Sequence, residues 1–245
     1  MKQIANILLC GLALMVAVIA QGAITETFDG PLTDAQWIVV RSGDAQESVA
    51  DVVDGRLHLR LNTLGTRDDT VKYLGIRTPQ ALDISEGVEI RYTLDWNQQE
   101  NGCYLGAGLV LCPTAPEVTD PITHVTSAAA PDGEPTFLVF DDLGVPPGKN
   151  LRAFCTLKRN KLDRYLFTDG WPKNKTGREL NLIHMRLQLT PQTLRIWEND
   201  TLLTEITNLK LPFTQTYLYL RLQSHSNYPA REVYFDDFSV TPIPN

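Results

Sequence analysis

The stretch Arg231-Glu-Val-Tyr-Phe-Asp-Asp-Phe-Ser-Val240 lies close to the end of a chain of 245 residues. It predicts a β-strand, because Val, Tyr and Phe dominate it and neither Gly nor Pro interrupts it. Its apolar residues stand at 233 and 235 and then at 238 and 240, so they cannot share one face of a regular strand. Either the strand is buried on both faces, or a β-bulge at Asp236-Asp237 restores the alternation.

The rest of the chain alternates in the same way over many short segments. Residues 56–62 send their leucines to one side, and residues 88–96 alternate apolar and charged side chains. No segment keeps a helical period over more than a turn or two. About a dozen short strands with regular turns predict an all-β sandwich or barrel, and the length requires no second domain.

The clearest unit is the meander over residues 182–206. A two-residue turn at Pro191-Gln192 would pair Arg186 with Trp197, and another at Asn199-Asp200 would pair Trp197 with Leu202. Tyr217, Tyr219 and Arg221 also point away from the leucines of their own strand. Aromatic rings with polar donors suit sugars. We therefore expect one ligand-binding face made of Arg186, Trp197, Tyr217, Tyr219 and Arg221, with Trp171 at its rim from a long loop expected over 163–175. The alternative is that they cover a sheet face or form cross-strand pairs.

The charge of the chain limits its possible partners, and its N-terminal segment predicts the cellular compartment. The formal net charge is −7 and the charges are interspersed, which argues against nucleic acid and against a polybasic membrane patch. Lys2, the apolar run over residues 4–20 and the small residues up to Gly22 predict a signal peptide over residues 1–22. An uncleaved anchor is the alternative. We expect a secreted, periplasmic or cell-surface protein, with one domain over residues 23–245 and no membrane span in its mature chain.

Cys103, Cys112 and Cys155 remain in the mature chain, so at most one intramolecular disulfide can form. Cys103 and Cys155 alternate in phase with the leucines of their strands, but the pairing stays open, and three core cysteines are the alternative. The sequence has no C-x-x-C and its histidines are dispersed, which argues against a zinc site.

Three stretches carry a resemblance to a known superfamily. They are Glu26-Thr-Phe-Asp-Gly30 with Trp37 following, the meander with Thr190-Pro-Gln-Thr-Leu-Arg-Ile-Trp-Glu-Asn-Asp-Thr201, and the closing strand quoted above. Together they resemble the concanavalin A-like lectins and glucanases, and among these the laminin-G-like secreted bacterial domains. The resemblance implies a two-sheet antiparallel jelly-roll sandwich.

The resemblance also implies that the first and last strands are neighbours in one sheet. Glu26 and Asp29 would then lie near Asp236 and Asp237. Ca²⁺ prefers such oxygen ligands, so Asp29, Asp236 and Asp237 are a candidate calcium site. One exposed Asp and one capped by backbone N–H groups are the alternative.

Catalysis can be examined against the same superfamily, whose laminarinase-type hydrolases carry Glu-x-Asp-x-x-Glu on one strand. The chemistry needs two carboxylates on either side of the glycosidic bond. The nearest match, residues 136–144, places Thr136 and Leu138 at the first two positions and keeps only Asp141. No catalytic residue is therefore assigned. We expect a carbohydrate-binding module with a polysaccharide or glycan partner. A sugar-active enzyme with a non-standard carboxylate pair and an adhesion module that binds protein are the alternatives.

Overall fold

The computed structural model describes residues 23–43, 45, 47–66, 71–95, 105–116, 137–144, 151–159, 162–168, 182–209, 211, 213–225 and 227–243. Residues 105, 137–144, 151–159 and 162–168 are described by their backbone alone. None of these residues is helical, so the described chain holds no helix that could span a membrane. The expected signal peptide, Cys103 and Trp171 lie outside the described residues. The loop expected over 163–175 is partly wrong, because a strand covers residues 162–168.

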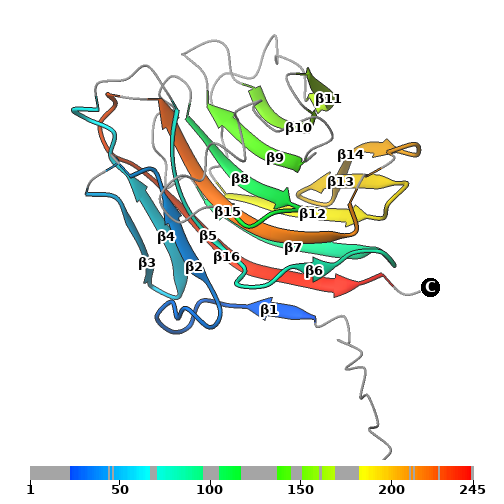
Figure 1. Cartoon of the computed structure of the whole chain (residues 1–245), viewed down its shortest axis with the longest axis horizontal. Helices are drawn as coiled ribbons and strands as arrows, with labels where there is room; N and C mark the ends of the chain where they lie inside the picture. Colours follow the sequence, from blue (N-terminus) through cyan, green and yellow to red (C-terminus); the bar gives the residue numbers. More distant parts are fainter. Residues whose placement is uncertain are drawn as a thin grey trace, which may run out of the picture.

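Two antiparallel sheets make up the described chain, which confirms the predicted sandwich (Figure 1). Sheet A has the order β14 (Thr201–Ile206), β13 (Leu194–Glu198), β12 (Leu182–Leu189), β7 (Val88–Asp95), β16 (Arg231–Pro242), β4 (Arg56–Leu61) and β3 (Val49–Val53), and β1 (Ile24–Glu26) pairs with β16. Sheet B has the order β11 (Leu162–Thr168), β10 (Leu151–Arg159), β9 (Phe137–Gly144), β8 (Leu105–Cys112), β15 (Gln215–His225), β5 (Val71–Arg77) and β2 (Ile38–Arg41), and β6 (Leu82–Asp83) pairs with β15.

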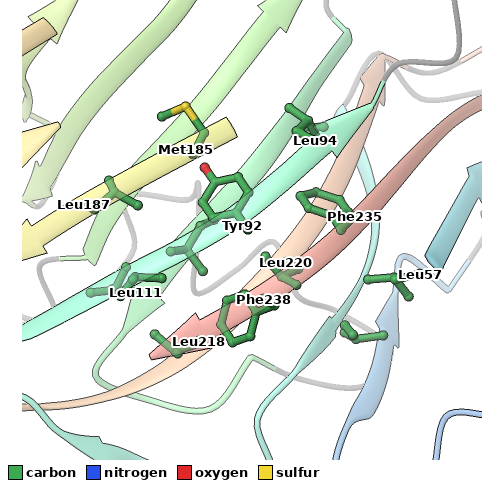
Figure 2. Close-up of a cluster of buried hydrophobic side chains, with 14 of the residues drawn as sticks. Leu57, Tyr92, Leu94, Leu111, Met185, Leu187, Leu218, Leu220, Phe235 and Phe238 are labelled. Atoms are coloured by element: carbon green, nitrogen blue, oxygen red, sulfur yellow. The ribbon is translucent and has the colours of Figure 1, made fainter. Parts of the chain in front are cut away.

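The core lies between the inner faces of the two sheets. Every second residue of β4, β7 and β12 in sheet A enters it, together with Val233, Phe235, Phe238 and Val240 of β16. Leu109 and Leu111 of β8 and the leucines of β15 enter it from sheet B. Figure 2 shows Tyr92 and Phe235 of sheet A beside Leu220 of sheet B. The alternation seen in the sequence therefore reports one buried face on each strand. We call the opposite, non-core side of each sheet its outer face.

A β-bulge in β16 resolves the irregular pattern of the closing strand. Asp236 pairs with Thr93 and Ser239 pairs with Arg91, so β16 advances three residues where β7 advances two. Asp237 is the extra residue, and its φ of 49° lies in the left-handed region. The bulge allows both Phe235 and Phe238 to enter the core, where Figure 2 shows them together.

The first and last strands are neighbours, as the resemblance implied. Glu26 of β1 pairs with Phe238 of β16. The Glu26 carboxylate accepts hydrogen bonds from the Phe28 backbone N–H (2.8 Å) and from the Trp37 indole N–H (3.0 Å). Trp37 in turn packs edge-on against Phe238, with 5.4 Å between ring centroids. Glu26 thus fastens the start of the chain to the closing strand instead of facing a ligand.

Candidate functional site

The structure divides the predicted binding residues between the two sheets. Arg186 and Trp197 lie on the outer face of sheet A, on β12 and β13. Tyr217, Tyr219 and Arg221 lie on β15, on the outer face of sheet B. The hypothesis that all five form one face is therefore wrong, because the core separates the two groups.

Arg186 and Trp197 are a directly opposed pair, and Trp197 pairs with Leu202 across the next strand. Both pairings confirm the two-residue turns expected at 191–192 and 199–200. The Arg186 guanidinium lies 4.5 Å from the centroid of the Trp197 ring. Trp197 is partly exposed and the Leu202 side chain is 48 % exposed. An aromatic ring, a cation and an apolar side chain thus lie in one row on an accessible surface.

Glu89 of β7 organises the polar groups beside this row. Its carboxylate accepts hydrogen bonds from Arg186 Nε (2.9 Å), Gln188 Nε2 (2.7 Å) and Arg91 Nε (2.6 Å). Burial raises the pKa of Glu89, but the three donors outweigh this effect and hold its pKa below the usual value. Glu89 is therefore a fixed negative charge at neutral pH. We call Glu89, Arg91, Arg186, Gln188 and Trp197 together the Trp197 surface.

The sheet B group has a different environment, because Tyr219 and Arg221 are 0 % and 2 % exposed. The Arg221 guanidinium lies 5.0 Å from the centroid of the Tyr73 ring, which is also buried. Tyr217 is partly exposed, and Arg77 lies 5.6 Å from its ring centroid. In this structure Tyr219 and Arg221 are covered, which is the alternative that the sequence left open for them.

Gly75 explains how Tyr219 fits on that face. A Cβ at Gly75 would lie 2.6 Å from Cε2 of Tyr219 and 2.1 Å from the carbonyl oxygen of Leu220. Only glycine allows β5 to approach β15 this closely. Cys112 lies on the same buried face, and burial raises the pKa of its thiol to about 12. It is a free cysteine. Cys103 and the Cys155 side chain are outside the described part, so their pairing stays a prediction.

The candidate calcium ligands are near one another, but they do not form a coordination cage. Among the described residues, no group of three His, Cys, Asp or Glu is placed to hold a metal ion. Asp29 accepts a hydrogen bond from the Thr27 hydroxyl (2.6 Å), and Asp236 accepts one from the backbone N–H of Asp237 (2.7 Å). Burial raises the pKa of Asp236, and the charges of Asp237 and Asp29 raise it further.

A second polar cluster, which sequence reasoning missed, lies on the outer face of sheet A around His58. Its Nδ1 lies 2.8 Å from Asp51 Oδ1, and its Nε2 lies 3.6 Å from Glu232 Oε2. The ring stacks on Tyr234 with 4.8 Å between centroids. Nε2 is buried and, within the described part of the chain, has no hydrogen-bond partner. The sequence signalled only that His58 points away from the leucines; Asp51 and Glu232 come from the two strands on either side of β4.

No family model and no curated protein matches the sequence. Solved structures do match in fold. An endo-β-galactosidase from Clostridium perfringens that releases GlcNAcα1-4Gal has a TM-score of 0.57 at 12 % identity, over 90 % of this chain and 62 % of that chain. A β-glucanase from Bacillus licheniformis has a TM-score of 0.59 at 10 % identity, over 92 % and 100 %. The carbohydrate recognition domain of Emp46p has a TM-score of 0.56 at 11 % identity, over 91 % and 97 %. The chain has the concanavalin A-like jelly-roll fold.

The chain therefore shares its architecture with a galactosidase, a glucanase and a carbohydrate recognition domain. At 10–12 % identity these likenesses show the fold alone, and a fold by itself does not separate catalysis from binding. Two of the motif positions, Leu138 and Asp141, lie on β9 next to β8 in sheet B. The Trp197 surface is on the other sheet, so it is separate from the strand that was compared with the hydrolase motif.

Proposed function

We propose that this jelly roll is a secreted, non-catalytic carbohydrate-recognition domain and that it binds glycan through the Trp197 surface. The observation that carries the proposal is the row of Arg186, Trp197 and Leu202 on an accessible sheet face. The C–H face of a sugar packs on aromatic and apolar groups, while guanidinium and amide N–H groups donate to its hydroxyls. Both kinds of group are present within this one row and its neighbours.

Pre-organisation of the donors supports the same function. Glu89 holds Arg186 and Gln188 at 2.9 and 2.7 Å, so neither long side chain has to be immobilised when a ligand arrives. Immobilising each such side chain would otherwise cost about 0.5–1.5 kcal/mol. A face that is already ordered suits the weak, multi-contact binding of polysaccharides.

The test is a glycan array and a polysaccharide pull-down on the mature domain, followed by calorimetry on any ligand found. Trp197→Ala should weaken binding about tenfold or more, as expected for an aromatic anchor. Tyr234→Ala is the matched control, because it removes an aromatic ring from the same outer face, on β16. Circular dichroism verifies that both variants fold. Absence of binding to any glycan, or equal losses in the two variants, would contradict the proposal.

A calcium requirement is tested in the same experiment by adding EDTA. Binding that is lost with EDTA and restored by Ca²⁺ would support a site at Asp29, Asp236 and Asp237. Equal binding with and without EDTA would count against it.

The second candidate is a sugar-active enzyme with a non-standard carboxylate pair. Two similar structures are named as a galactosidase and a glucanase, and the carboxylates of Asp51 and Glu232 lie on opposite sides of His58. Release of reducing ends from a bound polysaccharide, abolished in Glu232→Gln, would favour this candidate over pure recognition. Binding without product release would favour recognition.

A further inference from the structure

The Trp197 surface carries an unbalanced positive charge. Two guanidinium groups, those of Arg91 and Arg186, share the single carboxylate of Glu89. The Arg91 and Arg186 side chains are 54 % and 34 % exposed, whereas the Glu89 side chain is only 13 % exposed. Because its pKa is lowered, Glu89 stays ionised and contributes one negative charge against two positive ones. One net positive charge therefore remains, on the most accessible groups.

Among the described residues, Arg91 and Arg186 form their ion pairs with Glu89 alone. Arg195, on the strand beyond Arg186, forms an ion pair with Glu205 at 2.8 Å and is neutralised there. The carboxylates at the bulge, Asp236 and Asp237, are on β16, and the guanidinium that acts on Asp236 is that of Arg56. The whole chain has a formal net charge of −7, so a positive region is a local feature of this surface and not a property of the protein.

We propose that the sugar unit recognised at the Trp197 surface is anionic and carries a carboxylate or a sulfate group. This inference rests on the proposed function. A guanidinium has five N–H donors in a planar fork that matches carboxylate and sulfate oxygens, and Glu89 occupies only part of the donors of Arg91 and Arg186. The anionic group lies against Arg91, the more exposed of the two, and the ring of the sugar packs beside Trp197.

The experiment compares matched ligands that differ only in charge. Calorimetric titrations would use oligogalacturonate against its methyl ester, and a sulfated galactan oligosaccharide against its desulfated form. At low ionic strength the anionic member of at least one pair should bind about fivefold more tightly, the effect of one unit charge at contact in water. That preference should fall at 300 mM NaCl, where charges on an exposed surface are screened. The two pairs distinguish a carboxylate from a sulfate ligand.

Two variants test whether Arg91 causes the preference for the anionic ligand. Arg91→Gln should remove most of the preference for the anionic ligand, so the anionic member of a pair should lose more affinity than the neutral member. Arg60→Gln, on β4, makes the same change of charge on the same face beside Glu232, and should alter neither. Equal affinity for both members of each pair, no salt dependence, or equal effects of the two substitutions would overturn the inference.

The outcome separates this inference from the proposed function. Neutral glycans that bind as tightly as anionic ones, and lose affinity in Trp197→Ala, would leave recognition standing and remove only the anionic preference. A domain that binds none of the four oligosaccharides nor any array glycan would overturn both. The salt dependence is measured on the unaltered domain, so the test holds even if a variant fails to fold.

Discussion

Deleting Asp237 should leave the fold intact, whereas deleting Ser239 should not. Between Asp236 and Ser239, β16 uses one residue more than β7 uses between Thr93 and Arg91, so removing Asp237 removes the extra residue and keeps both pairs. The deletion loses the hydrogen bond from the Asp237 N–H to Asp236 (2.7 Å), about 1 kcal/mol, and relieves a left-handed φ of 49° that costs about as much. The free energy of unfolding should change by about 1 kcal/mol or less.

Deleting Ser239, by contrast, cannot keep all the side chains of β16 on their native faces. If the bulge persists, Val240 moves to the outer face and the hydroxyl of Thr241 turns inward. The first change costs about 1.5–3 kcal/mol and the second about 1–3 kcal/mol. If the bulge is absorbed instead, the Asp237 carboxylate enters the core and Phe238 leaves it, which costs more. The loss is at least about 2.5 kcal/mol, a large part of the total stability of a typical domain.

The assay is urea unfolding followed by tryptophan fluorescence. Trp37 is buried and its ring lies 5.4 Å from that of Phe238, so it reports on this part of the core. Equal losses for the two deletions, or a larger loss for the deletion of Asp237, would show that the bulge does not determine which side chains enter the core.

Three further predictions concern single residues. Gly75→Ala places a Cβ 2.1 Å from the Leu220 carbonyl oxygen, so it should lower the free energy of unfolding by about 2 kcal/mol or more. Gly30→Ala is the control, because a Cβ there meets no atom within 4 Å, and it should change the free energy of unfolding by less than about 0.5 kcal/mol. Thermal unfolding measures both. Because burial raises the pKa of Asp236, its ionised form costs stability at pH 7. Asp236→Asn should therefore be more stable at pH 7 in urea unfolding, and the difference should shrink as the pH falls through the folded pKa of Asp236. Cys112, buried and with its pKa raised to about 12, should resist iodoacetamide at pH 8 in the native protein and react in urea, as peptide mass mapping would show. Equal stability of the two alanine variants, a less stable Asp236→Asn protein, or rapid native alkylation of Cys112 would contradict the respective argument.

The fold could be predicted because the alternation of apolar and polar residues along each strand shows which face of that strand is buried. The leucines of β4 and the apolar residues of β12 alternate with polar ones, and all the core-facing members are buried as expected. The closing strand was the informative exception, since its broken alternation left only two structures possible. Turn lengths also fixed local pairing, so the opposition of Arg186 and Trp197 followed from a two-residue turn.

The grouping of the candidate site could not be predicted in the same way. Alternation tells which side chains leave the core, but the outer faces of sheets A and B look alike in sequence. Trp197 and Tyr219 were therefore assigned to one face although they lie on opposite sides of the sandwich. The same limit concealed the His58 cluster, because Asp51 and Glu232 meet His58 only through the order of β3, β4 and β16.

The bulge also shapes the surface on which the proposed ligand would lie. Because β16 gains one residue at Asp237, both Asp236 and Ser239 face outward and the exposed Asp237 is added between them. These carboxylates, with Asp29 nearby, place negative charge on β16, in the middle of sheet A. Arg91 and Arg186 place positive charge on β7 and β12, the next two strands toward β14. An anionic chain held by Arg91 and Arg186 would be repelled by the carboxylates of β16, so it would run from β7 toward β14, at the edge of the sheet, and not across the whole face.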